Sequence, residues 1–265
     1  CRRHHAQTIA CAACGPRLAL LRADGTPVAV DDPVREAAAL LDAGSVVAVR
    51  GIGGFHIACT EEAAGELKRR LGRTEQPLAV MATPDEVERI AVVSDEDRRA
   101  LHSRARPIVV LAKRDLASHP GISNLHTIGC MLPYTGLHHL LFANLAHPLL
   151  IMTSANLPGY PMITDLSIAL DRLSGQVDYI LTHDRRIVNR CDDSVVRDGY
   201  IIRLSRGLAP KRTAIDLGDV CILGVGPELN ANISIYQKGF CITSPHVGNV
   251  RNPQTLAYLQ ETVEK

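Results

Sequence analysis

Tryptophan is absent from this sequence of 265 residues, and phenylalanine occurs only three times. The interior of the protein must therefore be filled largely by aliphatic side chains. No apolar run approaches the roughly 18–20 residues that cross a bilayer, and no secretory signal precedes the first patterned segment. We therefore expect no membrane partner.

Neither sign of charge is in excess, because 29 Lys and Arg residues face 28 Asp and Glu residues, for a formal net charge of +1. This balance argues against a protein that coats nucleic acid, although it leaves room for a local basic groove. The eight cysteines are too few in a chain of this length to form a disulfide scaffold. We expect a reduced, cytoplasmic protein.

The chain opens on Cys rather than Met, and we interpret it as part of a longer polypeptide. Cys11 and Cys14 form a Cys-x-x-Cys pair followed by Gly, the pattern that supplies half of a tetrahedral zinc site. Cys1, His4 and His5 could complete the site, or its other half could lie upstream. The alternative is an ordinary pair of small residues. We take Cys11 and Cys14 as the candidate zinc ligands.

Helical and extended patterns alternate through the middle of the chain. Helices are expected at about 34–43, 61–72, 84–91, 94–104 and 167–175 and, after a loop, at the end of 129–145. Strands are expected at 45–51, 77–82, 106–113, 148–156 and 178–184, and a glycine-rich bend leads into another one ending at 59. The alternation predicts an α/β fold. Two or three strands with tight turns in 219–248 indicate that a new domain begins there.

The stretch from His183 to Gly207 combines short apolar runs, typical of strands, with many charges. Its arginines stand at positions 185, 186, 190, 197, 203 and 206, and its aspartates at 184, 192, 193 and 198. One interpretation is a structural lattice of ion pairs. The other places the arginines on a nucleotide and the aspartates on arginines or magnesium. His183, at a strand end, is either a base or a hydrogen-bonding residue.

Three further motifs are each ambiguous alone. Ser154 and Asn156 follow a buried strand, where open α/β sheets bind ligands, but they also suit a plain turn. The cations of residues 68–77 suit a solvated face better than a phosphate clamp. The glycines of residues 49–56 suit a tight turn better than an anion-binding loop.

Taken in order, the motifs point to one family. They are RRHHAQTIACAACGP, VAVRGIGGFHIAC, PLAVM, GCMLPYTGLHHLL, IMTSAN, THDRRIVNRCDDSVVR and RLSRGLAP. The sequence closely resembles the HypF family of hydrogenase maturation carbamoyltransferases over nearly its whole length. The resemblance implies a zinc-knuckle remnant at 1–16, a YrdC-like domain at 30–212 and the ASKHA-like opening of a carbamoyl-transfer domain at 218–265. For the YrdC-like domain it implies a twisted mixed sheet with flanking helices and a concave ligand cavity.

The same resemblance implies an activity. The YrdC-like domain of this family makes carbamoyl-adenylate from ATP and a carbamoyl group that originates in carbamoyl phosphate. The transfer domain passes that group to the C-terminal cysteine of a HypE-like acceptor, where it becomes a cyanide ligand of a nickel–iron hydrogenase. ATP, Mg²⁺ and Zn²⁺ are the expected cofactors. Two alternatives stay open: a diverged nucleotide-binding paralogue without catalysis, and a YrdC-like threonylcarbamoyl-adenylate synthase that would bind tRNA or double-stranded RNA.

Site residues follow from positions that match the family's motifs. Those expected to serve catalysis are Arg73, His183, Arg185 and Arg206. Those expected to bind the nucleotide or the carbamoyl group are Arg70, Met152, Ser154, Asn156, Asp193, Ser194, Arg203 and Ser205. Cations of this kind would stabilise charge on the transferring phosphate, and positioning would supply most of the remaining catalysis.

The sequence departs from the family pattern at the expected phosphate clamp. Leu71 and Gln76 stand where the family usually has lysines. The basic residues 68–70 could compensate from the preceding helix turn; otherwise the chain is a binding paralogue without efficient turnover. In the segment after residue 218, Asn249 replaces a common Asp, whereas His246 is retained.

Overall fold

The computed structural model describes residues 15–73, 75–156 and 160–264. The expected zinc ligands Cys11 and Cys14 lie outside these ranges, as do Cys1, His4 and His5. Within the described ranges, no helix is both long enough and apolar enough to cross a membrane.

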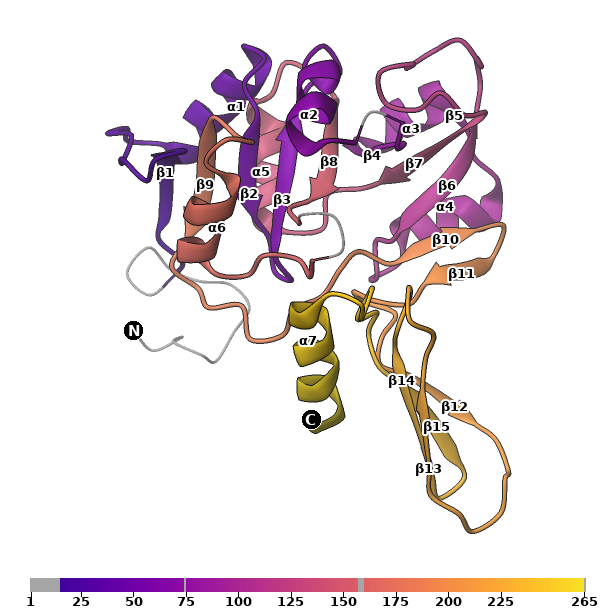
Figure 1. Ribbon diagram of the computed structural model, residues 1–265. Coiled ribbons are helices and arrows are strands. Elements are labelled where there is room, and N and C mark those ends of the chain that lie inside the picture. The colour runs from indigo at the N-terminus through magenta and orange to yellow at the C-terminus, as the bar shows by residue number, and fades with distance from the viewer. Residues whose placement is uncertain (1–14, 74, 157–159, 265) are drawn as a thin grey trace.

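A large mixed sheet forms the centre of the molecule (Figure 1). In the described part of the chain its strands run in the order β1-β9-β2-β3-β8-β4-β7-β6-β10-β11, and β5 pairs with β6. Their bounds are β1 Leu18–Arg22, β2 Val47–Arg50, β3 Phe55–Cys59, β4 Ala79–Ala82, β5 Ala91–Val92, β6 Ile108–Lys113, β7 Thr127–Met131, β8 Leu149–Ser154, β9 Tyr179–His183, β10 Val195–Arg197 and β11 Tyr200–Arg203. The pairs β2–β9, β4–β7 and β6–β10 are parallel and the others antiparallel, so the sheet is mixed as expected.

Helices cover both faces of this sheet and divide the aliphatic core in two. Successive residues of β2 alternate between the two clusters, because neighbouring side chains of a strand point to opposite faces. The cluster on one face includes residues of α2 Ala64–Leu71, α3 Pro84–Ile90, α4 Asp95–His102 and α6 Leu166–Leu173. The cluster on the other includes residues of α1 Pro33–Asp42 and α5 Gly136–Asn144. The result is a three-layer α/β/α arrangement, with α2 and α6 in front in Figure 1.

A second, smaller sheet follows the large one. It consists of the antiparallel strands β12 Lys211–Ala214, β13 Ile222–Val225, β14 Ile233–Gln237 and β15 Phe240–Thr243. The last helix, α7 Pro253–Glu264, packs Leu259 against Ile233 and Val247. The Tyr258 hydroxyl of this helix donates to the Arg190 carbonyl at 3.0 Å, and the His246 amide donates to the Leu204 carbonyl at 2.8 Å. These contacts attach the C-terminal segment to the chain that precedes β10 and follows β11 of the large sheet.

Most of the expected elements are present, and a few are corrected. Residues 129–131 were expected in a loop but belong to β7, and the helix expected to reach residue 91 ends at Ile90. Strands β1, β5 and β12 and helix α7 were not expected. Leu18–Arg22 lies ahead of the expected domain start at residue 30, yet β1 is paired with β9 along its whole length.

The glycine-rich bend before β3 brings two distant segments into close contact. The Cys191 amide donates to the Gly53 carbonyl at 3.1 Å. A Cβ atom on Gly53 would lie 2.3 Å from the carbonyl oxygen of Cys191, which is backbone and cannot rotate away. The tight-turn interpretation of this bend therefore holds, and glycine is required there by the close approach of the 191–193 segment.

Replacement of Gly53 by Ala should destabilise the protein by about 1–3 kcal/mol, because the added methyl group must displace the backbone at Cys191. Gly65→Ala in α2 is the matched control, since a Cβ there meets no atom within 4 Å and alanine favours a helix. Denaturant unfolding measures both. Equal stabilities for the two variants would contradict the close approach.

Candidate functional site

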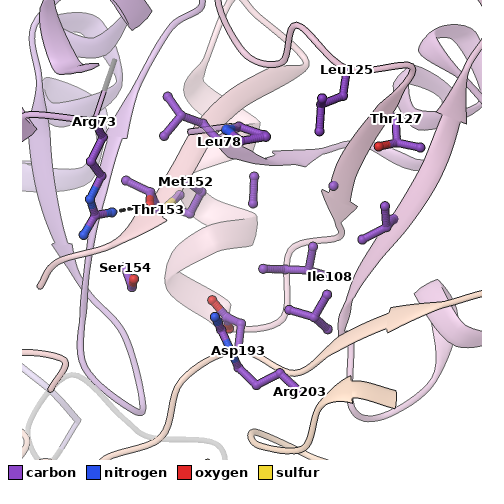
Figure 2. Close-up of a pocket in the computed structure, with 15 residues that line it drawn as sticks. Arg73, Leu78, Ile108, Leu125, Thr127, Met152, Thr153, Ser154, Asp193 and Arg203 are labelled. Atoms are coloured by element: carbon purple, nitrogen blue, oxygen red, sulfur yellow. Dashed lines mark hydrogen bonds between the residues drawn. The ribbon is translucent and has the colours of Figure 1, made fainter. Parts of the chain in front are cut away.

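A cavity of about 350 Å³ opens beside the end of β8, between β4, β7 and the start of β10 (Figure 2). Apolar side chains form one part of its lining, among them Leu78, Ile108, Val110, Leu125, Met152 and Val195. The polar part is contributed by Arg73, Thr153, Ser154, Asp193 and Arg203. Figure 2 places Arg73 and Arg203 on different sides of this space. A cavity of this size, mostly apolar with a few polar groups, is typical of small-molecule sites.

Arg73 reaches the cavity from the end of α2. Gly72 ends that helix in the left-handed conformation, and the Arg73 amide donates to the Lys68 carbonyl at 2.9 Å. One guanidinium nitrogen donates to the backbone carbonyl of Asn156 at 2.7 Å and to its Oδ1 at 3.0 Å. The other lies 3.4 Å from Thr153 Oγ1. Burial lowers the pKa of Arg73, and the fixed guanidinium offers a positive charge to an anionic ligand.

Ser154 and Asn156 form the polar turn that follows β8. The Ser154 hydroxyl donates to Asn156 Oδ1 at 2.9 Å, and Asn156 Nδ2 donates to the Tyr160 carbonyl at 3.1 Å. The Asn156 side chain therefore holds Arg73 and Ser154 in place through one oxygen atom. The end of a strand in an α/β sheet is where ligands commonly bind, and here the turn organises the polar side of the cavity.

The Asp193 carboxylate is buried between two basic side chains. One oxygen lies 2.8 Å from His56 Nε2, and the other accepts from Arg206 Nε at 2.8 Å. Burial on its own raises the pKa of Asp193, but His56 and Arg206 outweigh it and hold this pKa below its ordinary value.

Arg206 is committed to this buried network. Its terminal nitrogens donate to the carbonyls of Ala105 at 2.6 Å and Arg106 at 2.8 Å, and its guanidinium carbon lies 3.6 Å from the centre of the Tyr134 ring. Arg206 is only 7% exposed and does not line the cavity. It braces Asp193 rather than bordering the cavity.

Ser194 and Ser205 connect the two segments that carry Asp193 and Arg206. The Ser194 hydroxyl donates to the Arg206 carbonyl at 3.1 Å and accepts from the Ser205 amide at 2.9 Å. Both serines are fully buried. Arg203, by contrast, lines the cavity and is paired with no carboxylate in the described part of the chain. The charged stretch thus contains one arginine, Arg206, that braces Asp193 and another, Arg203, that faces the cavity.

Three expected site residues lie elsewhere in the structure. His183 ends β9 beside β1, its carbonyl accepts from Arg50 at 2.8 Å, and its ring accepts from the Arg185 amide at 3.2 Å. Burial, then Arg50, lowers the pKa of His183. Arg70 pairs with Glu66 at 2.7 Å and with Asp178 at 2.9 Å. Neither His183, Arg185 nor Arg70 lines the cavity, and their functional roles stay predictions.

The two positions that depart from the family pattern differ in environment. Leu71 is 7% exposed and belongs to the hydrophobic core, so its side chain points away from a phosphate clamp. Gln76 is exposed and precedes Pro77, which lines the cavity. Arg69 and Arg70 both pair with Glu66, and none of residues 68–70 lines the cavity. Compensation by these residues stays a prediction.

Sequence reasoning missed the buried ring cluster behind Asp193. His56 lies in β3 opposite Ser154, and the Tyr134 ring lies 6.5 Å from His56 and 4.5 Å from His138. His138 is fully buried with no hydrogen bond to either ring nitrogen, and burial lowers its pKa to about 3. His56 sits just after the glycine bend and Tyr134 in the motif LPYTG; the spacing gave no sign that they meet.

Comparison with known proteins places the chain in a family. Residues 39–205 match the model of the Sua5/YciO/YrdC family, described as "Telomere recombination". Because this match covers more than half of the chain, the chain belongs to that family. Residues 1–21, which include Cys11 and Cys14, match a model described as "HypF finger".

Curated relatives confirm the resemblance to HypF. The chain is 42% identical over 245 residues to the probable carbamoyltransferase HypF of Methanocaldococcus jannaschii, a match that covers 88% of this chain and 32% of that protein. It is 38% identical over 268 residues to the carbamoyltransferase HypF of Rhodobacter capsulatus, covering 98% and 36%. The chain therefore spans about a third of the length of these relatives.

Solved structures agree with the fold. HypF of T. kodakarensis superposes with a TM-score of 0.91 at 40% identity, covering 99% of this chain and 36% of that one. A full-length HypF in a phosphate- and nucleotide-bound form gives a TM-score of 0.89 at 37% identity, covering 99% of this chain and 36% of that one. P. abyssi Sua5 with L-threonine gives 0.57 at 20% identity over 65% of this chain and 54% of that one, which is evidence for the fold alone. The expected YrdC-like α/β fold is confirmed.

Asp193→Asn should destabilise the protein by about 3–5 kcal/mol, because it leaves Arg206 buried without its counter-charge. Since folding lowers the pKa of Asp193, its contribution is present above the unfolded value of about 3.9 and is lost as the pH falls below it. Unfolding measured from pH 7 to pH 2 tests both statements.

The exposed Asp198→Asn serves as the control, since Asp198 lies at the surface with positive φ, which asparagine tolerates. Asp198→Asn should lose as much stability on acidification as the unaltered chain does. Asp193→Asn should lose less stability over the same pH range. Identical pH profiles for all three proteins would contradict the buried network.

Proposed function

We propose that this chain activates a carbamoyl group by adenylation, forming carbamoyl-adenylate from ATP and a carbamate that originates in carbamoyl phosphate. The observation that carries the proposal is the cavity itself, which combines apolar walls with two arginines, Arg73 and Arg203, and the polar turn at Ser154. The similarity of the chain to HypF carbamoyltransferases supports the same class of reaction.

The proposed reaction balances as a simple displacement. A carbamate oxygen attacks the α-phosphorus of ATP, and a new oxygen–phosphorus bond forms. The bond between the α-phosphorus and the bridging oxygen breaks, and pyrophosphate leaves with the electron pair. Arg73 and Arg203 would orient the phosphates and stabilise the charge that develops on them. No covalent step on the protein is needed, so positioning supplies most of the catalysis.

The apolar part of the cavity suits the base of the nucleotide. Leu78 and Ile108 offer flat aliphatic contacts and Thr127 a hydroxyl, whereas the charges gather around Ser154 and Asp193. This division would keep the base at one end and the reacting phosphate at the other. Enclosure also protects carbamate, which decomposes readily, from reaction with water.

The described residues offer no preformed metal cage. Among them no group of three His, Cys, Asp or Glu side chains could hold an ion, and both oxygens of Asp193 are engaged. Magnesium commonly binds through substrate phosphates with one or two carboxylates, so it would arrive with ATP and neutralise phosphate charge. Zinc on Cys11 and Cys14 remains a separate proposal for the finger region.

The remainder of the proposed pathway follows from family membership rather than from the cavity. It comprises transfer of the carbamoyl group to the C-terminal cysteine of a HypE-like acceptor, and maturation of a nickel–iron hydrogenase in the cytoplasm. Residues after 218, including His246, would belong to the transfer region.

One observation favours an alternative, in which the chain binds nucleotide without turnover. Neither Leu71 nor Gln76 supplies the cation usual in the family, and Leu71 is built into the core. A threonylcarbamoyl-adenylate synthase is less well supported, since the likeness to Sua5 concerns the fold alone.

Carbamate-dependent exchange between ATP and pyrophosphate is the test. We expect exchange with the unaltered chain and a loss of about 10²–10³-fold in Arg73→Ala, because a fixed cation would be removed from the reacting phosphates. Arg69→Ala is the matched control: Arg69 lies in the last turn of α2, just before Arg73, but it is exposed to solvent and pairs with Glu66, so exchange should be unchanged.

Exchange that appears only after Gln76→Lys would overturn catalysis by this chain and favour the binding paralogue. Gln76 is the position to vary because it is exposed beside the cavity. Leu71→Lys would place an ammonium group in the core, and its effect on folding would obscure the result.

A further inference from the structure

A second cavity of about 170 Å³ lies between the large sheet and the C-terminal segment. Ser154 and Arg203 line it as well as the first cavity, so the two spaces adjoin at these side chains. Asp192 closes it from the large sheet, and His246 and Asn249 close it from the opposite side. At this volume it is smaller than the roughly 300–1,000 Å³ of typical ligand pockets, so it suits only a small group.

Two charged side chains of opposite sign line the second cavity, the acceptor Asp192 and the donor Arg203. Asp192 is half-buried, and its carboxylate accepts no hydrogen bond from the described residues. Asp192 and Arg203 both line this cavity; burial raises the pKa of Asp192, and the positive charge of Arg203 opposes this effect. The charges cancel, so the cavity favours a ligand with both an anionic and a hydrogen-donating end.

The C-terminal segment adds uncharged polar groups. Asn249 Oδ1 accepts from the Arg251 amide at 3.0 Å, which leaves its amide nitrogen available as a donor. Burial, then Arg203, lowers the pKa of His246 to about 4, so His246 is neutral at pH 7 and adds no second positive charge. Arg203 and the Asn249 amide are therefore donors of the cavity, and Asp192 is its anionic acceptor.

We propose that the second cavity is the subsite for carbamate, with Arg203 bound to the carboxylate oxygens and Asp192 accepting from the amino group. This inference rests on the proposed adenylation. Carbamate is planar, with acceptor oxygens at one end and an NH₂ donor at the other, and the arginine fork matches a carboxylate. Inorganic phosphate has no such donor end as a dianion, and Asp192 repels it. A nucleotide is too large for this space.

The position of the subsite suits the reaction. Because Ser154 and Arg203 border both cavities, a carbamate held against Arg203 lies next to the polar end of the first cavity. Its oxygen would then approach the α-phosphorus from the side opposite the apolar wall. The C-terminal segment thereby contributes to the site, through the groups at 246 and 249 that close the smaller cavity.

Binding of ¹³C-labelled carbamate, supplied as ammonium carbamate without ATP, tests the subsite directly by NMR line broadening. The bicarbonate signal in the same sample is an internal reference. The 265-residue chain should broaden the carbamate signal, and Asp192→Asn, which is nearly isosteric, should weaken the apparent affinity at least tenfold. Asp198→Asn, an exposed aspartate on the turn after β10, should bind as the unaltered chain does.

Each result decides the matter. No broadening by the unaltered chain, undiminished broadening by Asp192→Asn, or displacement by equimolar inorganic phosphate would overturn the subsite. If Asp192→Asn binds ATP within twofold of the unaltered chain, the variant is folded and the nucleotide does not occupy the smaller cavity. If its ATP affinity falls together with its carbamate affinity, the assignment is overturned. Carbamate binding without pyrophosphate exchange would uphold the subsite and contradict the adenylation.

Discussion

The buried carboxylate of Asp193, held between His56 and Arg206, is the interaction on which the site depends. It joins β3, the segment before β10, and the chain after β11 at one point, and Arg206 extends the connection to the carbonyls of Ala105 and Arg106. A buried charge with one partner removed is strongly destabilising, so each member requires the others. The position of the cavity-lining groups at 193 and 203 follows from this arrangement.

The same network explains how one stretch can be both core and ligand surface. Arg206 and Arg203 are three residues apart, but Arg206 donates to Asp193 and to two backbone carbonyls, whereas Arg203 faces both cavities. Asp192 and Asp193 differ in the same way. Both carboxylate oxygens of Asp193 are bound by His56 and Arg206, whereas Asp192 lines the smaller cavity.

Much of the fold follows from the sequence, since apolar runs such as those of β2, β8 and β9 are long enough to identify strands. Among the strands that were not predicted, two have a clear physical reason: β7 contains Gly129, which suits a loop, and β1 is stabilised by pairing with a strand about 160 residues away. The gathering of Arg73 with Ser154 and Asn156 was foreseeable from motif positions. The separation of Arg203 from Arg206, and the approach of His56 to Asp193, depend on tertiary contacts that no local pattern encodes.

The central claim is that the larger cavity holds ATP with its phosphates between Arg73 and Arg203. A crystal structure of the 265-residue chain with a non-hydrolysable ATP analogue tests it most directly. The account predicts the base against Leu78 and Ile108 and the α-phosphate near Ser154, with the smaller cavity beside Asp192 left free of nucleotide. Phosphates bound instead at the end of β9, beside His183 and Arg185, would contradict it.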